Sequence, residues 1–230
     1  MKKKNLLPTL PCLALILFTA GCGFDNFDAP DATITGRVTY HGEPICVSTS
    51  EGHHTELYLY QDGYQLNEPL QVYVDQDGSF NVKIFDGNYK LTTRQGYGPW
   101  KDRTDTLKFT LNGHHDIGNF EVTPYFTISN ADITMSGNTI NATFSIQQVV
   151  SEAALDKVTL YFSNRAIIDE GFFLKSVDMP IPATGSVSLS MDVSDISAIN
   201  SQASPHLFAR VGVKSNLSSY SIFSPVIQLK

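Results

Sequence analysis

Two pairs of adjacent histidines, His53-His54 and His114-His115, are the residues that most directly suggest a metal site. A closed zinc site takes four ligands. Adjacent residues of a strand point to opposite faces of its sheet, so one pair can rarely supply two ligands. The four rings could converge only if their two loops met at one end of a β-sandwich, and no cysteine or flanking carboxylate completes the set. We therefore expect solvated loop histidines, no bound metal and no other cofactor.

A second candidate is residues 75–78, Asp-Gln-Asp-Gly, which look like the opening of a calcium-binding loop. An EF-type loop also needs a further oxygen donor after the glycine and a glutamate at its twelfth position. Asp86 occupies the twelfth position, and Phe80, Val82 and Ile84 alternate before it as in a strand. The pattern favours a tight turn over a calcium site.

Nothing in the sequence pairs a nucleophile with a base. The Gly-x-Ser-x-Gly turn of serine hydrolases is absent. Asp102, Asp105 and the pair Asp169-Glu170 fall in expected loops, as is typical of a solvated surface. A lone cysteine such as Cys46 could be a nucleophile, but at the start of a strand it more often acts as a small hydrophobic residue. We therefore expect a protein that is not an enzyme.

Aromatic residues are the better candidates for a binding site. Tyr97 and Trp100, the only tryptophan, stand in a Gly- and Pro-rich loop and are followed by Lys101, Asp102 and Arg103. Flat aromatic rings suit the apolar faces of sugars, and the charged residues could hydrogen-bond sugar hydroxyls. These five residues are the predicted glycan-binding site. The alternative is that Trp100 folds back and caps the core of a sandwich.

The first 21 residues have the three parts of a secretory signal peptide. A basic head (residues 2–4) precedes an apolar run (residues 6–18), and small residues close the segment before Cys22. The run holds fewer than about 18 uninterrupted apolar residues, so it does not predict a membrane span.

Ala20, Gly21 and Cys22 resemble a bacterial lipobox, although Thr19 stands where leucine is usual. The resemblance implies cleavage before Cys22 and a thioether-linked diacylglycerol on its side chain. Residues 22–31 would then form a lipidated tether, too polar to fold alone.

The removed segment contains three lysines and no acid, so the formal charge of −7 becomes −10. An acidic chain argues against nucleic-acid binding. It also argues against electrostatic adhesion to anionic lipid, so membrane attachment is expected through the lipid anchor only. Cys12 leaves with the signal peptide and Cys22 is acylated, so Cys46 has no disulfide partner.

Short alternating runs separated by Gly, Asn and Asp fill residues 32–123, and they predict about seven strands of an antiparallel sandwich. The Asp-Gly pair at 77–78 predicts a β-hairpin, because it separates the alternating run that contains Val72 and Val74 from the run between Phe80 and Ile84. Thr123-Pro124 is the expected domain boundary, because proline ends strand pairing.

Residues 124–230 repeat the pattern, most clearly in the alternation of Ile140, Ala142, Phe144 and Ile146. Again about seven strands are expected, which predicts a second, Ig-like or fibronectin-III-like sandwich. The fold class is therefore all-β, with two tandem β-sandwiches.

Several segments, in their order and spacing, resemble an uncharacterised two-domain lipoprotein family of glycan-foraging Gram-negative bacteria. They are residues 27–38, Asp-Gly-Ser-Phe at 77–80, Phe-Asp-Gly-Asn-Tyr at 85–89, Gly-Pro-Trp at 98–100 and Phe-Glu-Val-Thr-Pro-Tyr at 120–125. The resemblance implies a first sandwich that is transthyretin-like or carboxypeptidase-regulatory-like and a second that is Ig-like. It carries over no catalytic residue.

Members of this family tend to be encoded beside starch-utilisation-type outer-membrane transporters and their glycan-binding lipoproteins. The resemblance therefore implies an outer-membrane lipoprotein at the cell surface that captures polysaccharide or oligosaccharide without catalysis. The alternative is a structural subunit that docks on the transporter and its lipoprotein partner and binds no sugar itself.

Overall fold

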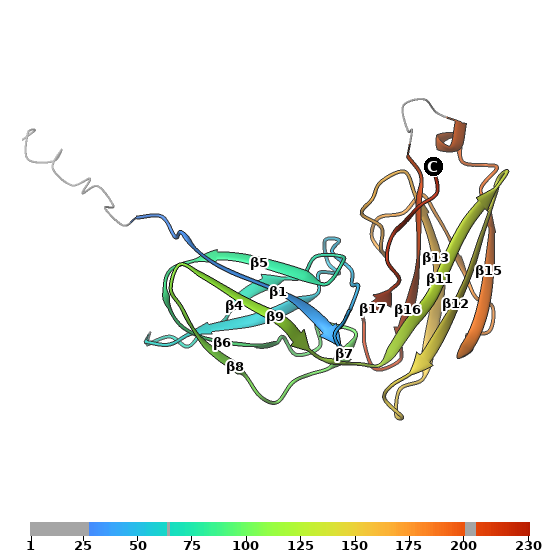
Figure 1. Ribbon diagram of the computed structural model, residues 1–230. Helices are drawn as coiled ribbons and strands as arrows, with labels where there is room; N and C mark the ends of the chain where they lie inside the picture. The colour runs from blue at the N-terminus through green and yellow to red at the C-terminus, as the bar shows by residue number, and fades with distance from the viewer. Residues whose placement is uncertain (1–27, 64, 201–205) are drawn as a thin grey trace, which may run out of the picture. The chain divides into compact units, whose positions relative to one another are not determined.

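The computed structural model describes residues 28–63, 65–200 and 206–230 (Figure 1). The signal peptide, the lipidation site Cys22 and most of the tether lie outside the described residues. Strands dominate, and the regular helix within the described part is one 3₁₀ turn, η2 (Ser197–Asn200). No helix there is long and apolar enough to cross a membrane. The prediction of an all-β chain with tandem β-sandwiches is confirmed.

The N-terminal sandwich consists of two sheets that pack face to face. The central strand of one sheet pairs antiparallel with two strands and parallel with a third. These are β1 (Ala32–Tyr40) with β2 (Glu43–Pro44), β5 (Ser79–Ile84) and the parallel β9 (His114–Glu121). The other sheet is antiparallel, in the order β4 (Leu70–Tyr73), β3 (Glu56–Gln61), β6 (Gly87–Thr93), β8 (Leu107–Leu111).

Strand β3 shows how the sequence pattern builds this sandwich. Leu57 and Leu59 are buried at 0% and 1% exposure, while Tyr58 and Tyr60, which alternate with them, are half-buried on the opposite face. Side chains of a strand alternate between faces, so one parity fills the core and the other remains at the surface. Burial of such aliphatic side chains contributes about 1.5–3 kcal/mol each.

The predicted hairpin around the Asp-Gly pair was wrong. The chain does turn there, since Gly78 donates to the Asp75 carbonyl at 2.8 Å and has a φ of +85°. However, β4 pairs with β3 in one sheet, and β5 pairs with β1 in the other. A local turn signal fixes the reversal of the chain, but long-range pairing decides which sheet the next strand joins. The carboxylate of Asp77 accepts hydrogen bonds from the amide and hydroxyl of Ser79 at 3.0 and 2.6 Å, as in a turn.

Strand pairing continues at the expected domain boundary. β7 (Trp100–Lys101) pairs with β10 (Thr123–Pro124), so Pro124 still lies in a short ladder opposite Trp100. The amide of Tyr125 then donates to the Pro99 carbonyl at 3.1 Å. The loop that contains Tyr97 and Trp100 is therefore held by the connection between the sandwiches.

The C-terminal sandwich has a three-stranded and a five-stranded sheet (Figure 1). The first is β11 (Phe126–Ser136), β12 (Thr139–Gln148) and β15 (Gly185–Asp192). The second is β14 (Lys175–Asp178), β13 (Leu155–Ser163), β16 (Phe208–Ser215) and β17 (Ser221–Phe223), with β18 (Ile227–Gln228) paired to β16. The predicted inward residues of β12, from Ile140 to Ile146, are all buried.

Residues 158–163 of β13 are buried on both faces, and so are residues 209–213 of β16. The outer face is covered by a second, smaller apolar cluster of Cys46, Tyr161, Ile168 and Phe223. The amide of Phe223 donates to the Cys46 carbonyl at 2.9 Å, so the segment after β2 lies directly on β17. Cys46 is buried, and burial raises the pKa of its thiol, as suits a packing residue.

Two buried charged residues, Arg210 and Asp169, hold the segment after β2 against the five-stranded sheet. The guanidinium of Arg210, 0% exposed, donates to the Ile168 carbonyl at 2.9 Å and lies 4.0 Å from the ring centroid of Phe223. The Asp169 carboxylate accepts from the amides of Thr49, Ser50 and Gly171, each at 2.9 Å.

The prediction that Asp169 belongs to a solvated surface was wrong, because its side chain is 1% exposed. Burial alone would raise the pKa of Asp169, but the hydrogen bonds from Ser50, Thr49 and Gly171 outweigh burial and lower it. Burial lowers the pKa of Arg210 to about 10, so the guanidinium remains charged at neutral pH. Residues 31–230 accordingly form one compact unit.

Candidate functional site

Trp100 lies in the core, so its prediction as a glycan contact was wrong. Its side chain is 1% exposed, and a Cβ added at Gly98 would stand 2.3 Å from the indole ring. Only glycine allows the loop to cross the ring so closely. Of the two alternatives that the sequence offered, the cap over the core is the one the structure has.

The other predicted residues do not converge on Trp100. Lys101 and Asp102 are exposed, and the Asp102 carboxylate accepts from the Gly96 amide at 3.1 Å. Arg103 is half-buried, where it donates to Asp105 at 2.7 and 3.0 Å and to the Glu121 carbonyl at 2.8 Å. Tyr97 is half-buried and belongs to a different aromatic group.

This group is a set of tyrosines on the outer face of sheet β4-β3-β6-β8, which we call the tyrosine face. It consists of Tyr58, Tyr60, Tyr73 and Tyr97. Tyr58 and Tyr60 meet edge to face with ring centroids 6.2 Å apart. Tyr73 is 52% exposed, and its ring centroid lies 5.0 Å from that of His54.

Arg94 connects two members of the tyrosine face. Its guanidinium carbon lies 3.4 Å from the ring centroid of Tyr97 and 5.4 Å from that of Tyr58. Burial would lower the pKa of Arg94, but the hydrogen bond and charge of Glu56 outweigh burial and raise it. The permanent cation and its ion pair with Glu56 therefore fix the orientation of both rings.

A shallow hollow of about 340 Å³ opens on the same face, lined by Tyr60, Lys90, Thr92, Arg103 and Asp105 among others. Lys90 also pairs with Asp62 at 2.6 Å. The hydrogen bond from Arg103 lowers the pKa of Asp105, so this carboxylate is an acceptor at neutral pH. Aromatic rings beside charged donors and acceptors can contact both the apolar face and the hydroxyls of a sugar.

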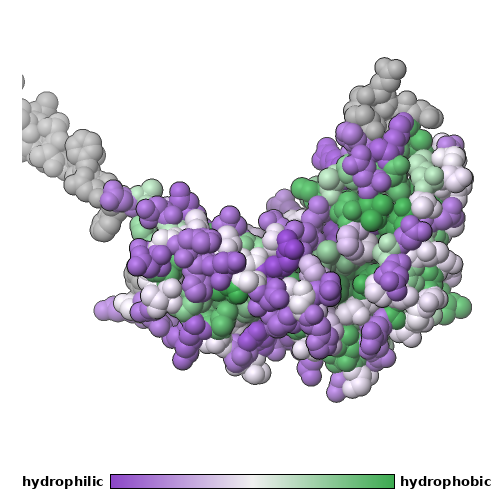
Figure 2. All heavy atoms as spheres, in the orientation of Figure 1, coloured by the Kyte–Doolittle hydropathy of each residue, from purple (hydrophilic) through white to green (hydrophobic). Residues whose placement is uncertain are grey.

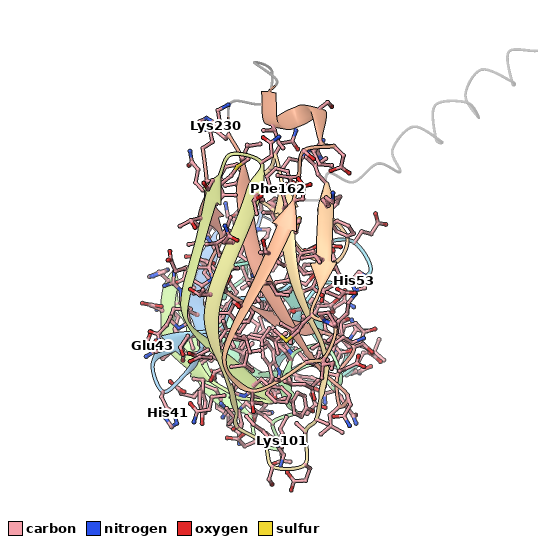
Figure 3. All side chains as sticks on the ribbon, turned by 90° about the vertical axis from the view of Figure 1, so that its right-hand side faces the viewer. His41, Glu43, His53, Lys101, Phe162 and Lys230 are labelled. Atoms are coloured by element: carbon pink, nitrogen blue, oxygen red, sulfur yellow. The ribbon has the colours of Figure 1, made fainter. Side chains whose placement is uncertain are left out.

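The two histidine pairs do not come together in the structure. The described part of the chain contains no group of three or more His, Cys, Asp or Glu side chains placed to hold a metal ion. His114 and His115 lie on β9 instead of a loop, and the His115 ring stacks on Phe109 at 4.7 Å. Figure 3 shows His53, on the loop before β3, well apart from His41 on the turn after β1.

Three residues of the tyrosine face, Tyr58, Tyr60 and Tyr73, were missed by the sequence analysis. The sequence did carry a signal for them. Each stands next to an inward-facing residue such as Leu57 or Val72, so the same alternation that buries those residues places the tyrosines outward.

Comparison with known structures places the chain among proteins of the same fold. A DUF3823 family protein from Parabacteroides merdae is 41% identical with a TM-score of 0.81, over 88% of this chain and 100% of the other. A DUF3823 family protein from Bacteroides ovatus is 33% identical with a TM-score of 0.76, over 86% and 98%. A protein of Bacteroides uniformis described as "a putative carbohydrate binding protein" has the same fold at 18% identity, with a TM-score of 0.69 over 88% and 100%.

No curated protein matches the chain. Two family models do, namely "Protein of unknown function (DUF3823) N-terminal domain" over residues 32–123 and "Domain of unknown function (DUF3823_C)" over residues 126–228. Together they span nearly all the residues that form the two sandwiches. On this ground, and on its likeness to the two solved relatives above 30% identity, the chain belongs to the DUF3823 family.

Proposed function

We propose that this protein is a non-catalytic, outer-membrane-anchored lipoprotein that captures polysaccharide at the cell surface through the tyrosine face. The observation that carries the proposal is the set of four tyrosine rings gathered at one sheet face, two of which, Tyr58 and Tyr97, are oriented by Arg94. The Bacteroides uniformis protein of the same fold, described in terms of carbohydrate binding, adds support from the fold alone.

The composition of the surface suits such contact. Figure 2 shows mostly hydrophilic side chains on the visible face of the N-terminal sandwich, with small hydrophobic patches among them. A glycan presents alternating hydroxyls and C–H faces, so isolated rings within a polar surface match it better than a continuous apolar patch does. Because the rings are distributed over β3, β4 and the segment after β6, they offer separate contacts to successive sugar units.

Replacing Tyr58 and Tyr60 with alanine should weaken polysaccharide binding at least tenfold, because each ring contributes about 1 kcal/mol or more of contact energy. The two side chains face away from the core, so the melting temperature should change little. Affinity electrophoresis and calorimetry against a panel of plant and host polysaccharides measure the loss.

Phe85→Ala is the matched control, since Phe85 is an exposed aromatic residue at 47% in the turn between β5 and β6. This variant should bind like the wild type. The proposal fails if the wild-type protein retains none of the glycans, or if the double variant retains them equally well.

The membrane anchor has its own test. Cys22→Ser should release the protein from the outer-membrane fraction and abolish its labelling with a radioactive fatty acid, because no other acylation site is expected. Cys46→Ala is the control, since Cys46 is buried and should leave fractionation unchanged. Retention of the Cys22→Ser variant in the membrane would exclude the lipid anchor.

A structural role beside the outer-membrane transporter and its lipoprotein partner is the second candidate. It is favoured by strand β15, which pairs only with β12 and so leaves one edge of eight residues unpaired within the described chain. Such an edge can accept a strand of another protein. Co-purification with the transporter in the absence of glycan distinguishes this role from glycan capture.

A further inference from the structure

A second hollow, separate from the tyrosine face, lies on the outer side of the five-stranded sheet of the C-terminal sandwich. It measures about 210 Å³ and is lined by residues of β13, β14 and β16, by the turn before β17 and by the loop that carries Glu170. His53, on the loop before β3, borders it as well. We call it the Glu170 pocket. It is smaller than the ~300–1,000 Å³ of sites that take drug-sized ligands, so it suits a single small polar molecule.

The carboxylate of Glu170 is the unusual group in this pocket. Both of its oxygens are buried and have no hydrogen-bond partner among the described residues. The adjacent Asp169 carboxylate, in contrast, accepts from three backbone amides. A buried carboxylate that no donor satisfies is destabilising, so Glu170 is expected to accept hydrogen bonds from a molecule that enters the pocket.

Residues that carry hydrogen-bond donors line the same pocket. Lys157 and Lys214 line the pocket, and the ammonium group of each is paired with a carboxylate, that of Asp178 at 3.1 Å and that of Asp156 at 3.5 Å. Because the lysines are already neutralised, they add donors to the pocket without a net positive charge. The remaining polar lining consists largely of residues that carry hydroxyl groups, namely Thr159, Tyr161, Ser176, Ser219 and Ser221.

One wall of the pocket is aromatic. Phe173 is 44% exposed, and its ring centroid lies 5.6 Å from that of the buried Tyr161. Tyr161 in turn packs on Phe223, whose centroid lies 6.0 Å away, so the wall is backed by the small apolar cluster of the junction. A ligand in the pocket therefore meets an apolar ring surface on one side and hydrogen-bonding groups on the others.

Two classes of ligand can satisfy a buried carboxylate. One is a cation, and the other is a molecule with a pair of hydroxyl donors. A small cation would find only the Glu170 carboxylate available, because the carboxylates of Asp178 and Asp156 are already paired with the two lysines. It would also lack the three or more ligand side chains that metal sites require, because the described residues contain no such group. A sugar ring carries adjacent hydroxyls for the two carboxylate oxygens, acceptors for the ammonium and serine donors, and an apolar face for Phe173.

We propose that the Glu170 pocket binds one sugar unit of the captured glycan, a chain end or a side branch. The ligand class rests on the proposed function, whereas the site is distinct from the tyrosine face. The difference in shape separates the two roles. The tyrosine face is spread over several strands and contacts a length of chain, whereas a hollow of about 210 Å³ admits only a unit that projects from the chain.

The test is calorimetric titration of the full chain with a panel of neutral monosaccharides and amino sugars, in parallel with polysaccharide retention. Glu170→Gln keeps the shape of the side chain but loses the charged acceptor, so it should lower the affinity for the bound monosaccharide at least tenfold. Its melting temperature in buffer should not fall, because the variant removes an unsatisfied buried charge. Glu152→Gln, a fully exposed carboxylate, is the control for the charge change.

The outcomes separate this inference from the proposed function. Monosaccharide binding that is lost in Glu170→Gln and kept in the Tyr58→Ala/Tyr60→Ala variant supports the pocket, even if polysaccharide retention fails. Polysaccharide retention without binding of any monosaccharide, or equal binding by Glu170→Gln, overturns the pocket and leaves the tyrosine face standing. Binding that disappears with EDTA would also overturn it, in favour of a cation.

Discussion

Arg210→Ala is expected to lower the free energy of unfolding by about 3–5 kcal/mol, since it both empties a buried volume and leaves buried acceptors unpaired. The guanidinium is 0% exposed and donates at 2.9 Å to the Ile168 carbonyl and at 3.5 Å to the Val47 carbonyl. Val47 belongs to the N-terminal sandwich and Ile168 to the C-terminal one, so one side chain joins segments from both. Urea denaturation followed by circular dichroism measures the change.

Two further variants show whether geometry or charge is responsible. Arg210→Lys retains the charge but loses the planar fork that reaches several acceptors, so most of the loss should persist. Arg37→Ala removes an arginine whose ion pair with Asp77 is about half exposed, and it should cost less than about 1 kcal/mol. A loss below about 1 kcal/mol for Arg210→Ala would show that the network at the junction adds little to stability.

Trp100→Ala should destabilise the fold by a similar amount, about 3–5 kcal/mol, because the indole is almost fully buried and its removal leaves a large cavity. The loss should come from packing alone, since the indole nitrogen has no hydrogen-bond partner within the described chain. Thermal unfolding followed by circular dichroism measures it.

The same variant also separates packing from ligand contact. At a temperature where Trp100→Ala is still folded, its affinity for polysaccharide should equal that of the wild type, because the tyrosine face does not include Trp100. Lys101→Ala, which changes the exposed neighbour, should affect neither property. Unchanged stability together with lost binding would mean that Trp100 is reachable by the glycan after all.

The sandwich architecture was predictable because alternation is a local property. Along β12, each inward residue from Ile140 to Ile146 is buried as the period-two pattern requires. The pattern could not show that β5 leaves β4 for the opposite sheet, because strand partners are chosen by contacts far apart in sequence.

The site was less predictable, for a related reason. A Gly-Pro-rich loop suggested exposure of Trp100, but Gly98 and Pro99 instead allow the chain to fold closely over the ring. Asp169 was expected at the surface. Its burial could not be predicted, because two of its three amide donors are residues 49 and 50, more than a hundred positions away in the sequence. Conversely, the outward tyrosines of β3 and β4 were predictable, because they alternate with the buried residues of the same strands.

The parallel pairing of β1 with β9 has a mechanical consequence. The ladder runs from Thr33 opposite His114 to Thr39 opposite Glu121, so the chain enters the sandwich at one end of these strands and leaves at the other. A pull on residue 31 against residue 123 therefore drags the two strands past each other along their length. The interstrand hydrogen bonds then bear the force together, in shear, instead of breaking one after another. If a long polymer tugs on the protein from beyond β9, the N-terminal sandwich should transmit the tension toward its N-terminal end without coming apart.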